Sequence, residues 1–221
     1  MHSPSMGRGT MRKIKYVLKR AVFRVSPALA ERCGIDFRLN APSRAFLENE
    51  VFGYVNRLTQ ADGGMKLLFL GLDKHNWHYP RLLSADFHSL DIKRANAAYG
   101  RPGRHQTGSA LQMDERYGEG AFDAVVANGL LGFGVNTEAD FRRLMVQCHW
   151  VLKPGGLLVL GYNNRPDRVP YPVTLQGGGM FDEFVPDIAG VQGARHQVDD
   201  AYRHIYVFAR KSAMRGDAVR A

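Results

Sequence analysis

The chain has 221 residues, of which 45% are hydrophobic and 23% charged, as in an ordinary globular protein, and this composition excludes a collagen-like, wholly disordered or disulfide-stapled chain. The formal net charge of +9 is concentrated near the N-terminus, because residues 1–64 hold eleven Lys and Arg but only five Asp and Glu. The only cysteines, Cys33 and Cys148, lie far apart in the sequence. They predict a reducing, cytoplasmic location.

The first predicted element is a basic amphipathic helix over residues 12–25. Its apolar residues recur with helical spacing, while its cations lie mostly on the other faces. The apolar stripe comprises Ile14, Val17, Leu18, Ala21, Val22 and Val25, and the cations are Arg12, Lys13, Lys15, Lys19, Arg20 and Arg24. The pattern fits contact with an anionic membrane surface or another polyanion, and equally a helix whose stripe covers the core. The sequence leaves these alternatives open.

The remaining elements predict an alternating α/β chain. A second helix is expected from about residue 42 to 58, and four short apolar runs follow at residues 66–71, 87–92, 122–127 and 157–161. Such runs are typical of strands buried on both faces of a parallel sheet. Between the last two, Thr137 and Asp140 form a capping-box pattern that begins a helix. Residues 194–198 and 204–210 predict a closing antiparallel hairpin.

Ligands of an open parallel sheet bind outside the carboxyl ends of its strands, so the residues that follow each apolar run are the candidates for a site. Gly71 and Asp73 follow the first run. Asp91 ends the second run, twenty residues after Gly71, at the spacing where an acid meets the ribose hydroxyls of a nucleotide-like ligand. Asn128 and Asn163 follow the third and fourth runs. Together these positions predict a nucleoside-binding domain.

Two segments of this region resemble class I S-adenosylmethionine-dependent methyltransferases. They are the strand FDAVVAN at 122–128 and, after a helix, the segment VLKPGGLLVL at 151–160. The resemblance covers residues 65–211 and implies a Rossmann-like, seven-stranded, mostly parallel sheet with helices on both faces and an antiparallel last strand. Residues 1–64 would form a basic N-terminal helical cap, and residues 212–221 a flexible C-terminal tail.

The resemblance implies S-adenosylmethionine as the cofactor, but the family's glycine-rich loop is altered. Phe69 stands where the family has an acid, and only Gly71 remains of three glycines. Asp73 would place its carboxylate near the cationic methionine end of the cofactor, or else cap the next helix, and a carboxylate there disfavours a dinucleotide. The residues predicted to bind cofactor are Gly71, Leu72, Asp73, Asp91, Ile92, Ser109, Ala110 and Asn128.

Methyl transfer requires an acceptor lone pair in line with the methyl group, so positioning can supply most of the rate acceleration. If the acceptor is a hydroxyl, its proton needs a base, for which His75 and His78 are the predicted candidates. The resemblance implies that Asn128 orients the acceptor. The predicted acceptor-binding residues are Trp77, Asn163, Asn164 and Arg165. No metal-ligand set is convincing.

The sequence thus predicts a cytoplasmic methyltransferase that acts on an oxygen or nitrogen of a small-molecule or glycan acceptor. Residues 12–25 would add peripheral contact with the anionic inner membrane surface, where a lipid-linked sugar would be the acceptor. One alternative is a non-catalytic, partner-binding protein of the same fold. Another is an RNA methyltransferase, which is less favoured because few aromatic residues are interleaved with the N-terminal cations. The acceptor and the oligomeric state stay open.

Overall fold

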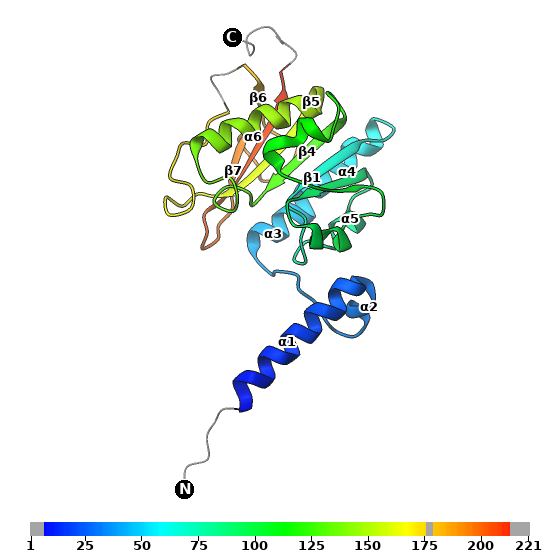
Figure 1. Ribbon diagram of the computed structural model, residues 1–221. Helices are drawn as coiled ribbons and strands as arrows, with labels where there is room; N and C mark the ends of the chain where they lie inside the picture. The colour runs from blue at the N-terminus through cyan, green and yellow to red at the C-terminus, as the bar shows by residue number, and fades with distance from the viewer. Residues whose placement is uncertain (1–6, 176–178, 213–221) are drawn as a thin grey trace.

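A computed structural model describes residues 7–175 and 179–212, with side chains from residue 15 onward (Figure 1). Apart from Ser212, the predicted C-terminal tail lies outside the described residues. The α-helices are α1 (Gly7–Val25), α2 (Pro27–Arg32), α3 (Pro42–Phe46), α4 (Phe52–Ala61), α5 (Tyr79–Leu82) and α6 (Glu138–Val151). A π-helical turn η1 (Leu47–Val51) joins α3 to α4, and two 3-10 helices, η2 (Arg94–Tyr99) and η3 (Ala110–Glu115), follow β2 and β3.

The described strands form one sheet in the order β3-β2-β1-β4-β5-β8-β6, with β7 paired to β8. They are β1 (Lys66–Leu70), β2 (Asp86–Asp91), β3 (His105–Thr107), β4 (Phe122–Asn128), β5 (Leu152–Asn163), β6 (Phe181–Glu183), β7 (Arg195–Gln197) and β8 (His204–Lys211). The first five strands are parallel, and β8 runs antiparallel to β5. The predicted fold class is confirmed; the short strand β7 brings the described strands to eight rather than seven.

The sheet divides the core into two layers because successive side chains of a strand point to opposite faces. Leu67 and Phe69 belong to the layer that also contains α4 and Phe23, whereas Leu68 and Leu70 belong to the layer covered by α6. Figure 1 shows α4 and α6 lying against the sheet. Both faces are thus apolar, which explains the almost continuous apolar runs of the central strands.

Asp123 connects the segments at 122–128 and 151–160 in the structure. Its Oδ2 accepts a hydrogen bond from the backbone N of Lys66 at 2.7 Å, and its Oδ1 lies 2.6 Å from Nζ of Lys153. One carboxylate therefore joins the starts of β1, β4 and β5. Helix α6, which directly precedes β5, begins at the predicted capping box, in which the side chains of Thr137 and Asp140 each accept from the other's backbone N.

The N-terminal residues form two parts. Helices α3, η1 and α4 form one continuous helical segment on the sheet, ending where Gly63 and Gly64 adopt positive φ angles of 70° and 131°. Helices α1 and α2 extend away from the sheet (Figure 1). Phe23 of α1 is fully buried, with its ring centroid 4.9 Å from that of Phe37 and 5.4 Å from that of Trp77. These aromatic contacts hold α1 to the rest of the molecule.

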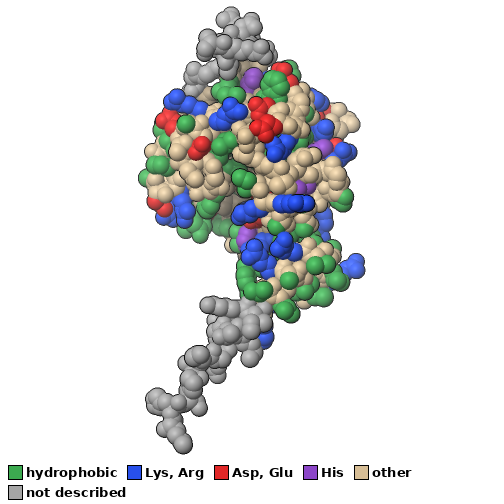
Figure 2. All heavy atoms as spheres, in the orientation of Figure 1, with side chains coloured by type: hydrophobic (Ala, Val, Ile, Leu, Met, Phe, Trp, Pro, Cys, Tyr) green, Lys and Arg blue, Asp and Glu red, His purple; other side chains and the backbone are tan. Residues whose placement is uncertain are grey.

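The apolar stripe of α1 does not cover the core. Val17, Leu18 and Val25 are 63%, 64% and 89% exposed. The cations Lys15, Lys19, Arg20 and Arg24 are also exposed. Figure 2 shows hydrophobic side chains on the surface of the α1–α2 region, and Lys and Arg side chains where it meets the sheet domain. Of the two interpretations that the sequence left open, packing of the stripe on the core is wrong for these described residues.

Candidate functional site

A cavity of about 600 Å³ lies at the carboxyl ends of β1, β2, β4 and β5. This is where an open parallel sheet places its ligands. Predicted site residues that line it are Gly71, Asp73, Asp91, Ile92, Ser109, Ala110, Asn128 and Asn163. The cavity is also lined by four residues of the segment Leu39–Arg44, and by Tyr202, His204 and Tyr206 of the C-terminal hairpin. Segments from both ends of the chain therefore complete the site.

The loop after β1 is held by side chains rather than by glycines. Gly71 has a φ of +84°, which only glycine adopts readily, so this glycine is required by the turn. The buried carboxamide of Asn76 accepts from the backbone N of Asp73 at 2.6 Å and donates to the carbonyl of Gly71 at 3.1 Å. Asp73 Oδ1 in turn accepts from the backbone N of His75 at 2.7 Å. These bonds fix the loop without the two missing glycines.

Asp91 combines a local structural role with a place on the cavity wall. Its Oδ1 accepts hydrogen bonds from the backbone N of Lys93 at 2.7 Å and from Nδ2 of Asn96 at 2.9 Å. Burial raises the pKa of the Asp91 carboxyl, although these two bonds oppose the shift. Oδ2 makes no hydrogen bond to the described residues and is available to a ligand's hydroxyl groups.

The region beyond Asp91 is suited to a flat apolar group. The side chain of Ile92 lines the cavity and is 69% exposed. Ser109 also lines the cavity, but its hydroxyl accepts from the backbone N of Leu111 at 3.1 Å, which begins η3. Ser109 therefore shapes this wall through its turn, and Ala110 follows it.

The opposite side, which we call the sheet wall, consists of Asn128, Asn163 and His204. Nε2 of His204 lies 3.0 Å from Oδ1 of Asn128, and Nδ1 lies 2.7 Å from Oδ1 of Asn163. Burial lowers the pKa of His204 to about 4, so the imidazole is neutral at physiological pH. A neutral imidazole has one N–H, so it donates to one of these two amide oxygens. A Cβ at Gly161 would collide with the Asn128 amide, which explains the glycine at that position of β5.

Several predicted site residues do not line the cavity. Leu72 is buried in the core, and Trp77 packs on Phe23 of α1. His75 Nδ1 lies 2.6 Å from the carbonyl oxygen of Phe37, and the buried His78 lies 3.1 Å from Glu48. These aromatic and imidazole groups attach the N-terminal segment to the β1 loop. Sequence patterns could not show this because the partners lie about 30 to 55 residues away in the chain.

Asn164 and Arg165 also lie outside the cavity. Arg165 is ion-paired at 2.9 Å with Asp167, and the backbone N of Asn164 donates to the carbonyl of Arg203. Both residues follow the end of β5, where the chain turns away from the sheet. Only Asn163, which pairs in register with His204, stays on the cavity wall.

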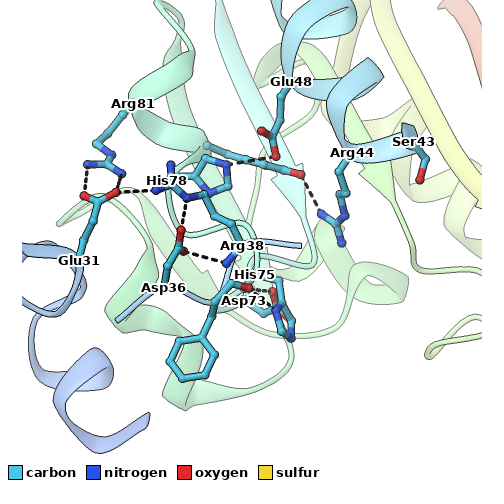
Figure 3. A network of polar contacts seen from close by, with 12 residues as sticks. Glu31, Asp36, Arg38, Ser43, Arg44, Glu48, Asp73, His75, His78 and Arg81 are labelled. Carbon is cyan, nitrogen blue, oxygen red and sulfur yellow. Dashed lines mark hydrogen bonds and ion pairs between the residues drawn. The ribbon is translucent and has the colours of Figure 1, made fainter. Parts of the chain in front are cut away.

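We call Leu39–Arg44 together with residues 71–79 the N-terminal wall. The polar contacts in Figure 3 hold these two segments and the residues next to them in place. Glu31 pairs with Arg38 at 3.0 Å and with Arg81 at 3.1 Å, and Arg38 also pairs with Asp36. Arg44 Nη1 donates to the hydroxyl of Tyr79 at 2.8 Å. Sequence reasoning missed Arg44, Asn76 and His204, since none of them belongs to a recognisable motif.

Comparisons with known proteins agree with this geometry. Residues 68–160 match the sequence model of a family described as "Methyltransferase domain". No curated protein matches the chain. The fold is similar to the N-methyltransferase NodS from Bradyrhizobium japonicum WM9, with 16% identity, 73% of this chain and 94% of that chain covered, and a TM-score of 0.53.

A second NodS structure, in complex with S-adenosyl-L-homocysteine, has 15% identity and a TM-score of 0.51, and the likeness covers 80% of this chain and 94% of that one. At these identities the likeness establishes the fold alone. The family match and the sheet topology agree over the same residues, including the segments at 122–128 and 151–160. Residues 68–160 therefore match a methyltransferase domain in sequence, and the chain has the fold of the methyltransferases to which it is similar.

Proposed function

We propose that the cavity binds S-adenosylmethionine and that the protein transfers its methyl group to a nitrogen or oxygen of a small-molecule or glycan acceptor. The observation that carries the proposal is the free carboxylate oxygen of Asp91, which lines a cavity at the carboxyl ends of the strands. A partly desolvated carboxylate is a strong acceptor for a pair of vicinal hydroxyl groups.

The residues present fit this cofactor. Asp91 would accept from the ribose hydroxyls, Ile92 would pack on the adenine, and the positive φ of Gly71 keeps the loop backbone open toward the ligand. A Cβ at Gly71 would lie 3.2 Å from Leu130, so a larger residue would also crowd the cavity. Asp73 provides negative charge beside the loop, where the family's strand acid is replaced by the buried Phe69.

When bound, S-adenosylmethionine supplies a methyl group on a sulfonium centre, which an acceptor lone pair attacks in line. The sheet wall presents the polar groups of Asn128 and Asn163, whose amides lie against the neutral His204. Both ring nitrogens of His204 face these amides, within 3.0 Å of their oxygens. We therefore infer that the chain promotes transfer by orienting the acceptor and excluding water, and that His204 acts as a positioning residue.

Calorimetric titration with S-adenosylhomocysteine tests the cofactor site. Asp91→Ala should weaken binding about 30- to 100-fold, as expected when hydrogen bonds to a charged group are lost. Asp182→Ala removes an exposed carboxylate of β6 and serves as the control. If the wild-type chain does not bind, the alternative of a non-catalytic, partner-binding protein is favoured. If Asp91→Ala binds like the wild type, the proposed ribose site is wrong.

The acceptor can be narrowed by supplying the purified protein with labelled S-adenosylmethionine and separate pools of amines, sugars and RNA. Transfer to the small-molecule or glycan pools would support the proposal. Transfer to RNA alone, with binding that weakens steeply as salt rises, would instead identify an RNA methyltransferase.

We further propose that α1 holds the protein at an anionic membrane surface, where a lipid-linked acceptor would be within reach. No helix among the residues that the structure describes is long and apolar enough to cross a bilayer. The support is the exposure of Val17 and Leu18 on the same helix as exposed cations, which is the pattern of an interfacial helix.

Co-sedimentation with phosphatidylglycerol-containing vesicles tests the membrane proposal, with phosphatidylcholine vesicles as the uncharged comparison. Replacing Val17 and Leu18 by Asp should abolish the binding to anionic vesicles. Val185→Asp, which alters an equally exposed apolar residue elsewhere, should not. Equal sedimentation of all three proteins would rule out attachment through α1.

A further inference from the structure

Arg44 presents a positive charge to the cavity from the N-terminal wall. It comes from α3, its side chain is half-buried, and one of its five N–H groups donates to the hydroxyl of Tyr79 at 2.8 Å. Figure 3 shows the guanidinium directed away from Glu48 and turned below Ser43. Gly71 and Asp73 line the same cavity.

This charge is not neutralised within the described part of the chain. Arg38, Arg81 and Arg195 all have carboxylates within 4 Å, whereas Arg44 has none there. Its hydrogen-bond partner cannot supply the missing charge, because burial raises the pKa of Tyr79 to about 12 and keeps the phenol neutral. A half-buried guanidinium without a carboxylate is unfavourable, so an anionic ligand would satisfy its remaining donors.

Asp73 supplies the opposite charge close by. Burial works against the charge of Arg44, but the neighbouring Tyr79, Tyr206 and Asp73 together raise the pKa of its guanidinium. Asp73 and Arg44 face one cavity without forming an ion pair with each other in the structure. Asp73 uses Oδ1 for the loop, and its Oδ2 makes no hydrogen bond to the residues that the structure describes. A guanidinium and a carboxylate held apart in this way complement a zwitterionic α-amino acid group.

Phe69 packs against the tyrosine that accepts the hydrogen bond from Arg44. This residue of β1 is fully buried, and its ring lies edge-on to Tyr79 with centroids 5.3 Å apart. Tyr79 also packs edge-on against Phe52 of α4 at 4.9 Å. The tyrosine hydroxyl that holds Arg44 is thus fixed by β1 on one side and by the N-terminal helices on the other.

We propose that Arg44 binds the carboxylate of the amino-acid end of S-adenosylmethionine, while Asp73 binds its ammonium group. The inference rests on the proposed function and deepens it. It assigns to the N-terminal segment a direct part in cofactor binding.

The test compares two ligands on the full-length chain by calorimetry. S-Adenosylhomocysteine carries the amino-acid end, and 5′-methylthioadenosine lacks it while keeping the adenosine. Arg44→Met should weaken binding of S-adenosylhomocysteine about 10- to 100-fold and change binding of 5′-methylthioadenosine less than twofold. Arg44→Lys should recover part of the affinity. Arg142→Met removes an exposed cation of α6 and controls for net charge.

The outcomes separate the inference from the proposed function. If the wild-type chain binds neither ligand, the proposed function fails. If the wild type binds both and Arg44→Met weakens both equally, Arg44 only shapes the cavity, and the inference is overturned. It is overturned as well if Arg44→Met leaves both affinities unchanged, in which case the guanidinium would serve an anionic group of the acceptor.

Discussion

The two walls of the cavity are built in different ways. The sheet wall follows directly from strand pairing, because Asn163 and His204 are register partners on β5 and β8, and Asn128 lies beside Gly161. The N-terminal wall depends on side-chain contacts between segments that the sheet does not join, such as Phe23 with Trp77 and Glu31 with Arg81. A site can therefore keep one wall rigid through its fold and vary the other through an added segment.

The largest effect is expected from Phe23→Ala, which removes the aromatic anchor of α1. Truncating a fully buried phenylalanine costs about 3–5 kcal/mol, so the N-terminal wall should loosen and binding of S-adenosylhomocysteine should weaken. Denaturant unfolding and calorimetry measure the two effects. Val25→Ala, which changes an exposed residue of the same helix, is the control. Unchanged stability and affinity would show that α1 does not support this wall.

The sheet wall should instead be sensitive to pH. Burial lowers the pKa of His204 from about 6.5 to about 4, so the stability that its neutral form contributes is present above pH 6.5 and is lost as the pH falls toward 4. The loss should reach up to about 3 kcal/mol. His204→Gln keeps one donor and one acceptor without a titrating group, so its free energy of unfolding should fall less between pH 7 and pH 4. Parallel pH profiles for both proteins would refute this role.

The smallest effect is expected from the ion pairs at the edge of the N-terminal wall. Arg81 and Glu31 are partly exposed, and such pairs contribute about 0–1 kcal/mol. Glu31→Gln should therefore lower the free energy of unfolding by less than about 1 kcal/mol, and the difference should shrink in high salt. A loss as large as that of Phe23→Ala would mean that the polar contacts, rather than the aromatic ones, hold this wall.

The sequence by itself determined the fold class and the sheet-end positions of the site. Apolar runs, the capping box at Thr137 and the paired segments at 122–128 and 151–160 are local signals, because strand burial and helix capping depend on nearby residues. Asp91 could be placed on the cavity for the same reason, as the end of a strand is fixed by the strand itself.

Only the tertiary structure decided which loop and terminal side chains reach the cavity. His75, Trp77 and His78 contact the N-terminal segment, and Arg44 and His204 enter the site from regions that the sequence marked as helix and hairpin. The physical reason is that these positions depend on contacts between residues far apart in the chain. A single sequence gives the chemical nature of such side chains, but their partners are set by how the N-terminal helices and the C-terminal hairpin pack on the sheet.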